Sequence, residues 1–142
     1  MTEYKKVFID TSFFIYLFDK DNLWCNKAEN FLNYLIQQRT NIFTSSVTYL
    51  EFCVKPYKEN RLDVIEEFKN LLFDLGVAIY DINIAIANLS AQLRSKYDFL
   101  KPMDAIQLGT SLYCECGYFM TNDKRLKNIE EINILILEEW KT

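Results

Sequence analysis

The sequence contains no histidine among its 142 residues. This absence excludes a Ser-His-Asp triad, a Cys-His dyad, histidine-based acid–base cleavage of RNA and any zinc site with histidine ligands. Hydrolytic chemistry in this chain would therefore rest on carboxylates, lysine, tyrosine, hydroxyl groups or a metal ion.

Long apolar runs are also missing. None approaches the roughly 20 residues that cross a bilayer, and the opening MTEYKKVFID lacks the apolar body and cleavage site of a signal peptide. We therefore expect a cytoplasmic protein with no membrane partner. No linker, repeat or low-complexity segment divides the chain, so a single domain is expected over residues 1–142.

Cysteine is present but sparse, with four residues, of which Cys114 and Cys116 form a C-x-C pair. No second pair of cysteines or histidines follows at a zinc-finger spacing. Free cysteine behaves as a small buried hydrophobe, and disulfides are rare in the cytosol. We expect reduced thiols in or near the core.

Short apolar segments alternate with longer stretches of helical periodicity, as in a parallel sheet covered by helices. The expected strands are Lys6–Ile9, Asn41–Thr44, Val77–Tyr80, Tyr118–Met120 and Ile134–Leu137. The first expected helix is Phe13–Phe18, capped by Thr11 or Ser12, and the second is Leu23–Gln38, with Ile36 on its apolar stripe. A third helix begins at Ser45 or Ser46 and runs through Glu51. The remaining expected elements are the helices Leu62–Phe73, Ile84–Tyr97 and Pro102–Cys114 and a helical turn at Lys124–Lys127. Pro56, Gly76 and Gly117 read as helix-ending signals. The fold class is thus a three-layer α/β/α sandwich with a mostly parallel sheet of about five strands.

Four acidic residues stand where a strand ends or a helix begins: Asp10 in VFIDTS, Glu51 in TYLEF, Asp104 in PMDAIQ and Asp123 in MTNDKRL. They are far apart in the sequence, so only a fold that gathers the carboxyl ends of strands would bring them together. Two carboxylates about 4 Å apart repel by roughly 4 kcal/mol at an effective dielectric constant of about 20. Such a cluster therefore needs raised pKa values or a divalent cation.

Each acid also has an ordinary structural interpretation. Asp10 and Asp123 are suited to cap helices, and Glu51 matches a capping box with Thr48. Asp104 falls in the first turn of a helix, where a carboxylate interacts favourably with the helix dipole. The apolar neighbours of Glu51 and Asp104 favour a functional interpretation, because an acid in such a context needs a partner. The net charge of −4 neither supports nor forbids a polyanionic substrate, since it would be zero without these four acids.

Three segments, taken in order, resemble the PIN-domain family, and most closely its small VapC-type toxins. VFIDTSFFIYLF resembles the family's opening strand and helix, which carry the first acid. TSSVTYLEF resembles the family's segment that carries the second acid. KPMDAIQLGTSLYCECGYFMTND resembles the helix and strand that hold the third and fourth acids.

This resemblance implies a metal-dependent endoribonuclease that is the toxin of a type II toxin–antitoxin pair. Carboxylate oxygens would hold one or two Mg²⁺ or Mn²⁺ ions, and a metal-activated water would attack the phosphodiester. The implied ligands are Asp10, Glu51, Asp104 and Asp123. Candidates to orient them or touch a phosphate are Thr11, Ser12, Thr121 and Asn122. The implied partners are an RNA substrate, an antitoxin that places a basic side chain at the acidic pocket, and a second copy in a homodimer.

Other interpretations remain open at this point. A PIN-like RNA-processing nuclease would use the same chemistry, and a non-catalytic RNA- or protein-binding module would keep only the fold. A phosphatase of another α/β family is disfavoured because no D-x-D pair follows the first strand. Six basic residues could form a rim that positions RNA by its backbone or a simple solvated surface: Arg94, Lys96, Lys101, Lys124, Arg125 and Lys127.

Overall fold

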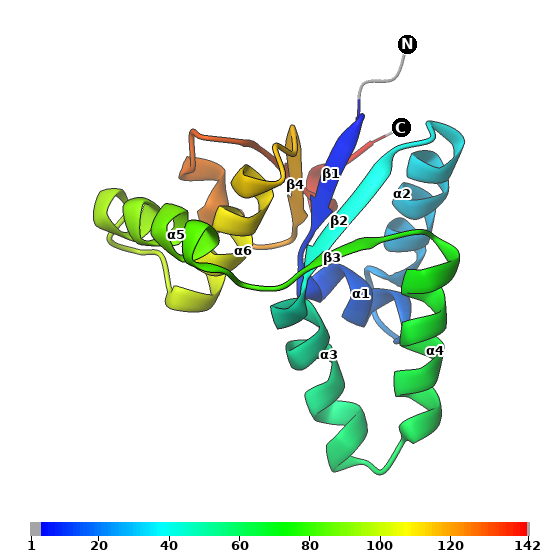
Figure 1. The fold of residues 1–142 in the computed structure, drawn as a ribbon. Helices are drawn as coiled ribbons and strands as arrows, with labels where there is room; N and C mark the ends of the chain where they lie inside the picture. Colours follow the sequence, from blue (N-terminus) through cyan, green and yellow to red (C-terminus); the bar gives the residue numbers. More distant parts are fainter. Residues whose placement is uncertain (1–3, 142) are drawn as a thin grey trace.

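The computed structural model describes residues 4–141, which form a five-stranded sheet with helices on both faces (Figure 1). The strands are β1 (Lys6–Ile9), β2 (Asn41–Ser45), β3 (Ala78–Tyr80), β4 (Tyr118–Thr121) and β5 (Asn133–Ile136). Their order is β3-β2-β1-β4-β5, and every neighbouring pair is parallel. The expected α/β/α sandwich is confirmed, with a sheet that is wholly rather than mostly parallel.

Helices α1 to α4 cover one face of the sheet and α5 and α6 the other, and α3 and α4 form a hairpin that extends beyond the sheet (Figure 1). The helices are α1 (Thr11–Leu17), α2 (Cys25–Gln37), α3 (Ser46–Lys58), α4 (Leu62–Asp74), α5 (Ile84–Lys96) and α6 (Pro102–Tyr113). Two 3₁₀ helices follow β4 and β5, namely η1 (Lys124–Asn128) and η2 (Leu137–Glu139).

The alternation of side chains along each strand builds a separate core on each face. Val7 and Ile9 of β1 are buried against α1 to α4, whereas Phe8 is buried against α5 and α6. Phe8 stacks on Phe119, its register partner in β4, with ring centroids 5.2 Å apart. This aromatic pair fixes β1 beside β4 at the centre of the sheet.

The strand order reverses between β1 and β4. The chain first adds β2 and β3 on one side of β1 and then places β4 and β5 on the other. The backbone N–H of Asp10 donates to the carbonyl of Met120 at 3.0 Å, which ties the carboxyl ends of the two strands together. Open parallel sheets bind ligands at such a point.

Helix starts were mostly predicted at the right place. Ser45 caps α3, and Pro102 opens α6, as expected. The prediction that Thr11 or Ser12 caps α1 was wrong, because Asp10 is the cap and its carboxylate accepts from the Thr11 N–H at 2.8 Å.

The apolar stripe predicted on α2 was correct except at its end. Ala28, Phe31, Leu32 and Leu35 are buried, but Ile36 is 51% exposed. Ile36 lies one residue past Leu35 and is therefore turned by about 100° around the helix, away from the sheet.

Two helix-ending signals were misread. Gly76 does end α4 with a left-handed backbone (φ 64°), but α6 turns at Glu115 (φ 58°), two residues before Gly117. Pro56 does not interrupt α3, which continues to Lys58. Pro56 is buried in the last turn, and the helix continues for two residues beyond it.

All four cysteines are buried and free, as expected. Burial raises the pKa of the Cys116 thiol to about 12, so this group is protonated and unreactive at neutral pH. No helix within residues 4–141 is long and apolar enough to cross a membrane.

Candidate functional site

Asp10 lies at the centre of the candidate site, between the end of β1 and the start of α1. Its carboxylate accepts hydrogen bonds from the Thr11 N–H at 2.8 Å, Thr121 Oγ1 at 3.1 Å and Gln107 Nε2 at 3.2 Å. Burial raises the pKa of Asp10, and the negative charge of Glu51 raises it further. The three hydrogen bonds lower the pKa but do not cancel the rise. Three donors from separate elements therefore hold a carboxylate whose ionisation is costly.

Glu51 reaches the site from the second turn of α3. Its Oε1 accepts from Thr11 Oγ1 at 2.6 Å, so the residue after Asp10 connects the first two acids. Thr11 itself is buried at 5% exposure, which fixes the orientation of this contact.

Asp104 comes from the first turn of α6, where Pro102 opens the helix. Its side chain is 26% exposed. Burial is the main cause that raises its pKa, followed by the charges of Asp10 and Asp123, while Arg125 and Lys101 oppose the rise. Asp104 is thus within electrostatic range of two other acids of the set.

Asp123 lies two residues beyond β4 and caps η1. Arg125 holds its carboxylate with a bidentate contact, Nε to Oδ1 at 3.0 Å and Nη2 to Oδ2 at 2.5 Å. These hydrogen bonds lower the pKa of Asp123. Nη2 of the same arginine lies 3.7 Å from Asp104 Oδ2.

The four acids line one cavity of about 490 Å³ at the carboxyl edge of the sheet. They come from four different segments that only the sheet topology brings together. The cavity is also lined by Ile15, Tyr16 and the four hydroxyl and amide residues singled out from the sequence, Thr11, Ser12, Thr121 and Asn122.

The PIN domain family model matches residues 7–132, a range that covers most of the chain and includes the positions of the four acids. The chain belongs to the PIN-domain family. Comparison with curated proteins gave no significant match.

Solved structures resemble this PIN domain over almost their whole length. A toxin–antitoxin complex from Klebsiella pneumoniae contains a chain with 23% identity and a TM-score of 0.70, with 92% of this chain and 97% of that chain covered. FitAcB from Neisseria gonorrhoeae gives 14% identity and a TM-score of 0.79 over 94% and 99% of the two chains. VapC20 from Mycobacterium tuberculosis, described as a Sarcin-Ricin loop cleaving toxin, has 13% identity and a TM-score of 0.67, with 89% of this chain and 98% of that chain covered. At these identities the likeness establishes a shared fold.

The donor chemistry of the PIN cavity fits a hard divalent cation, which prefers carboxylate oxygens. Neighbouring acids raise the pKa of two members of the set: the charge of Glu51 adds to the effect of burial at Asp10, and the charges of Asp10 and Asp123 add to it at Asp104. A cation would relieve this repulsion.

The acids are nevertheless not gathered into a finished ligand set. Within residues 4–141, no group of three or more acidic or cysteine side chains is arranged so that it could hold an ion. Arg125 holds Asp123, and Thr11 holds Glu51.

The hydroxyl and amide residues of the cavity differ in their contacts. Thr11 and Thr121 donate to the acids Glu51 and Asp10 respectively, and Thr121 Oγ1 also accepts from the Asp123 N–H at 3.2 Å. Asn122 instead accepts from the backbone N–H of Glu138 at 2.9 Å. Ser12 lines the cavity.

Gln107 is a site residue that sequence reasoning missed. It is buried at 2% exposure, and its Nε2 donates both to Asp10 and, at 2.7 Å, to Thr48 Oγ1. Its Oε1 accepts from Ser45 Oγ. One signal was available, because Gln107 is a polar residue three positions after Asp104 and so lies on the same face of a largely apolar helix.

Most of the basic residues proposed as a rim are engaged elsewhere. Lys96, Lys124 and Lys127 form ion pairs with Glu131, Glu138 and Glu139 respectively, and Arg94 donates to the carbonyl of Leu100. Arg125 instead pairs with Asp123 and lies near Asp104, both of which line the cavity, and the charge of Lys101 acts on Asp104.

Proposed function

We propose that this PIN domain is a Mg²⁺- or Mn²⁺-dependent endoribonuclease and the toxin of a type II toxin–antitoxin pair. The observation that carries the proposal is the convergence of Asp10, Glu51, Asp104 and Asp123 in one cavity. With histidine absent, these carboxylates are the groups through which the protein would hydrolyse a phosphodiester.

Asp10 and Asp104 are the principal ligands in this proposal. Both are partly desolvated and lie at the point where the strand order reverses. Glu51 joins them by rotating away from Thr11, and Asp123 by releasing Arg125. A bound divalent ion would neutralise the acids and acidify the water that attacks phosphorus.

The polar side chains around the acids keep them in place for this reaction. Gln107 and Thr121 hold the Asp10 carboxylate from opposite elements, α6 and β4. Once released from Asp123, Arg125 presents its guanidinium beside the cavity, where it would bind a phosphate oxygen of the RNA. Lys101 would contribute a second positive charge at the rim.

Two structural neighbours support the toxin assignment. One was solved as a toxin–antitoxin complex, and another is a toxin that cleaves the Sarcin-Ricin loop. We extend these roles to this protein as part of the proposal, together with an inhibitory antitoxin and homodimer formation.

The decisive test is cleavage of a mixture of total RNA and tRNA by the purified protein, with Mn²⁺ and with EDTA. We expect discrete fragments that require the metal and that Asp104→Asn reduces at least about 100-fold, since outer-shell changes alone cost 10- to 100-fold. Asp74→Asn is the matched control, because Asp74 is an exposed acid at the end of α4, outside the cavity. Equal cleavage by Asp104→Asn and wild type would contradict this site.

A toxin and an RNA-processing nuclease are separated by a growth experiment. Induced expression of the wild-type chain should arrest growth, and expression of Asp104→Asn should not. Metal-dependent cleavage without growth arrest would favour the processing role. Binding of RNA with no cleavage under any metal would favour the non-catalytic module.

A further inference from the structure

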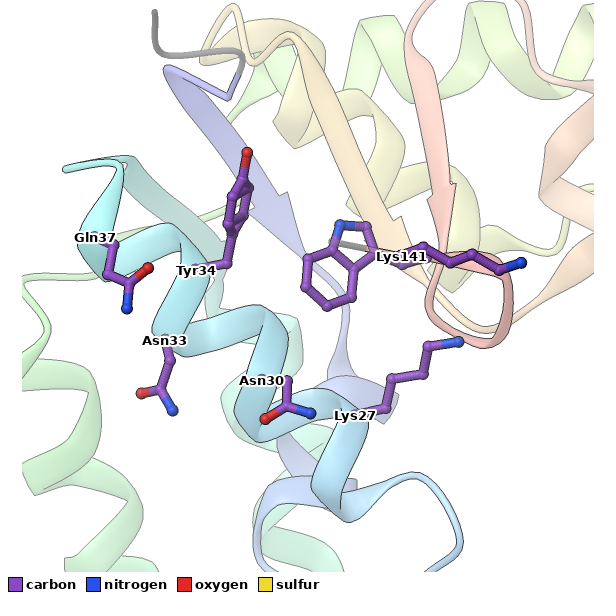
Figure 2. A pocket seen from close by; sticks show the side chains of 7 residues that line it. Lys27, Asn30, Asn33, Tyr34, Gln37 and Lys141 are labelled. Atoms are coloured by element: carbon purple, nitrogen blue, oxygen red, sulfur yellow. The ribbon is translucent and has the colours of Figure 1, made fainter.

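A second groove lies on the outer side of α2, away from the acidic cavity. It has a volume of about 580 Å³ and is lined by Lys27, Asn30, Asn33, Tyr34, Gln37, Trp140 and Lys141 (Figure 2). We call it the lysine–amide groove. Among residues 4–141, no acidic side chain lines it, although the protein has 20 acidic and 16 basic residues. It is therefore locally positive on an acidic protein.

The amides of this groove follow one face of α2. Asn30, Asn33 and Gln37 are spaced three and four residues apart, so they form a row about 10 Å long at a rise of about 1.5 Å per residue. All three are exposed, and Figure 2 shows them projecting from the outer side of the helix. The opposite face supplies the buried residues of α2, so packing does not require this polar row.

An aromatic wall supports the groove. Trp140 is buried at 8% exposure and packs edge-on against Phe31, with ring centroids 5.0 Å apart. Tyr34 lies beside it at 5.7 Å and is partly exposed. The wall is therefore rigid and offers the ring of Tyr34 as a surface on which a planar group could stack.

The two lysines lie at one end of the groove (Figure 2). The Lys27 ammonium donates to the backbone carbonyl of Glu138, which anchors it, and Lys141 is exposed. The nearby acids Glu138 and Glu139 are paired with Lys124 and Lys127, so they do not cancel this positive charge.

Glu138 links the groove to the acidic cavity by hydrogen bonds. The backbone N–H of Glu138 donates to Asn122, which lines the cavity, while the carbonyl of Glu138 accepts from Lys27, which lines the groove. A chain molecule bound at the cavity would reach the groove by passing over this segment.

We propose that the lysine–amide groove binds the single-stranded RNA that flanks the bond to be cleaved, an inference that rests on the proposed function. Lys27 and Lys141 would contact phosphates, Tyr34 would stack on a base, and the amides would meet base edges. Amides both donate and accept, as base edges require. An acidic peptide would need donors alone, so RNA fits this lining better.

The test is binding of a labelled single-stranded RNA to the full chain in EDTA, followed by fluorescence anisotropy over a series of salt concentrations. Lys141→Gln should weaken binding about three- to tenfold and reduce the slope of log K against log salt by about 0.7, the value for one lost phosphate contact on a single strand. Asn33→Ala should weaken binding with the slope unchanged. Lys58→Gln makes the same charge change at the end of α3, in the hairpin that extends beyond the sheet, and should alter neither quantity (Figure 1).

Groove variants that bind RNA with the wild-type affinity and slope would overturn the inference. It would also fall if an oligo-glutamate peptide displaced the RNA as well as unlabelled RNA does, because the groove would then be a general anion or acidic-peptide site. Metal-dependent cleavage by the wild type distinguishes the two proposals. If the wild type cleaves RNA but the groove variants bind RNA as the wild type does, only the groove proposal falls. If the groove variants bind RNA more weakly but the wild type does not cleave it, only the nuclease proposal falls.

Discussion

Arg125 is the residue on which the charge of the acidic cavity depends most directly. Its guanidinium binds Asp123 in a bidentate manner and lies 3.7 Å from Asp104. Its hydrogen bonds lower the pKa of Asp123, and its charge opposes the rise that burial causes at Asp104. An arginine of the chain itself thus competes with any cation for two of the four acids.

We predict that Arg125→Ala strengthens Mn²⁺ binding by about two- to fivefold, the modest range expected when an exposed ion pair is removed. Electron paramagnetic resonance titration of free Mn²⁺ would measure this affinity without any RNA. Lys127→Ala is the control, since Lys127 pairs with Glu139 and does not line the cavity. Unchanged or weaker Mn²⁺ binding in Arg125→Ala would show that the arginine does not compete.

Single residues were predictable where their type and their place beside a strand or helix end were both informative. Asp10, Glu51, Asp104 and Asp123 met this condition and line one cavity. Arg125 was expected on a basic rim instead, because its bidentate geometry depends on the turn of η1. Gln107 could not be paired with Asp10 from the sequence, since 97 residues separate the two.

At the scale of elements, the contact between α5 and α6 depends on Gly109. A Cβ atom added there would lie 2.3 Å from Ser90 Oγ and 3.1 Å from both the Ile86 carbonyl oxygen and the Ser90 nitrogen. The hydroxyl can rotate away, but the two backbone atoms can move only if α5 shifts. Because α6 also holds Asp104 and Gln107, this contact positions part of the site.

We predict that Gly109→Ala destabilises the protein by about 1–3 kcal/mol, as overpacking of a close contact does. Alanine favours a helix by about 0.5–1 kcal/mol over glycine, which offsets only part of this cost. The melting temperature should fall by roughly 2–4 °C for each kcal/mol. Gly117→Ala is the matched control, because no atom lies within 4 Å of its added Cβ, and it should melt like the wild type. A Gly109→Ala protein as stable as this control would contradict the proposed packing.

The boundaries of elements were predicted less well than their existence. All five strands and all six α-helices exist close to the expected positions. The end of α6 was expected at about Cys114 and lies at Tyr113, but the left-handed residue that follows is Glu115 and not Gly117, although glycine usually occupies that conformation. The sequence of a single chain does not reveal which of two nearby residues the tertiary packing forces into that conformation.

For the whole molecule, the buried acids connect stability to pH. Burial raises the pKa of Asp10 above its ordinary value of 3.8. Between that value and the raised pKa, the folded state holds more protons than the unfolded state, so this group's contribution to stability falls as pH rises. The contribution is complete below the ordinary pKa of aspartate and is lost as pH rises through the raised pKa.

We predict that Asp10→Asn raises the melting temperature of the metal-free protein at neutral pH by a few degrees, on the order of 1 kcal/mol. Asparagine keeps the helix cap and removes the charge. The difference in melting temperature between variant and wild type should shrink as pH falls toward the ordinary pKa of aspartate. Asp74→Asn should show no comparable trend. A constant difference at every pH would mean that the Asp10 charge does not limit stability.

From the sequence alone one could predict the α/β/α class, the parallel sheet and the candidate acids. These depend on local physics: apolar segments of strand length, helical periodicity, caps, and acids placed at strand ends. The absence of histidine likewise excluded histidine-based hydrolysis.

Only the tertiary structure decided how those acids are held. The order β3-β2-β1-β4-β5 places Asp10 beside the end of β4, and side chains from α3, α6 and η1 then reach it or its neighbours. The pairing of Asp123 with Arg125, the bridge from Gln107 and the groove along α2 depend on distances between segments remote in sequence. Such contacts are set by packing, because no local pattern in the chain determines which distant side chains meet.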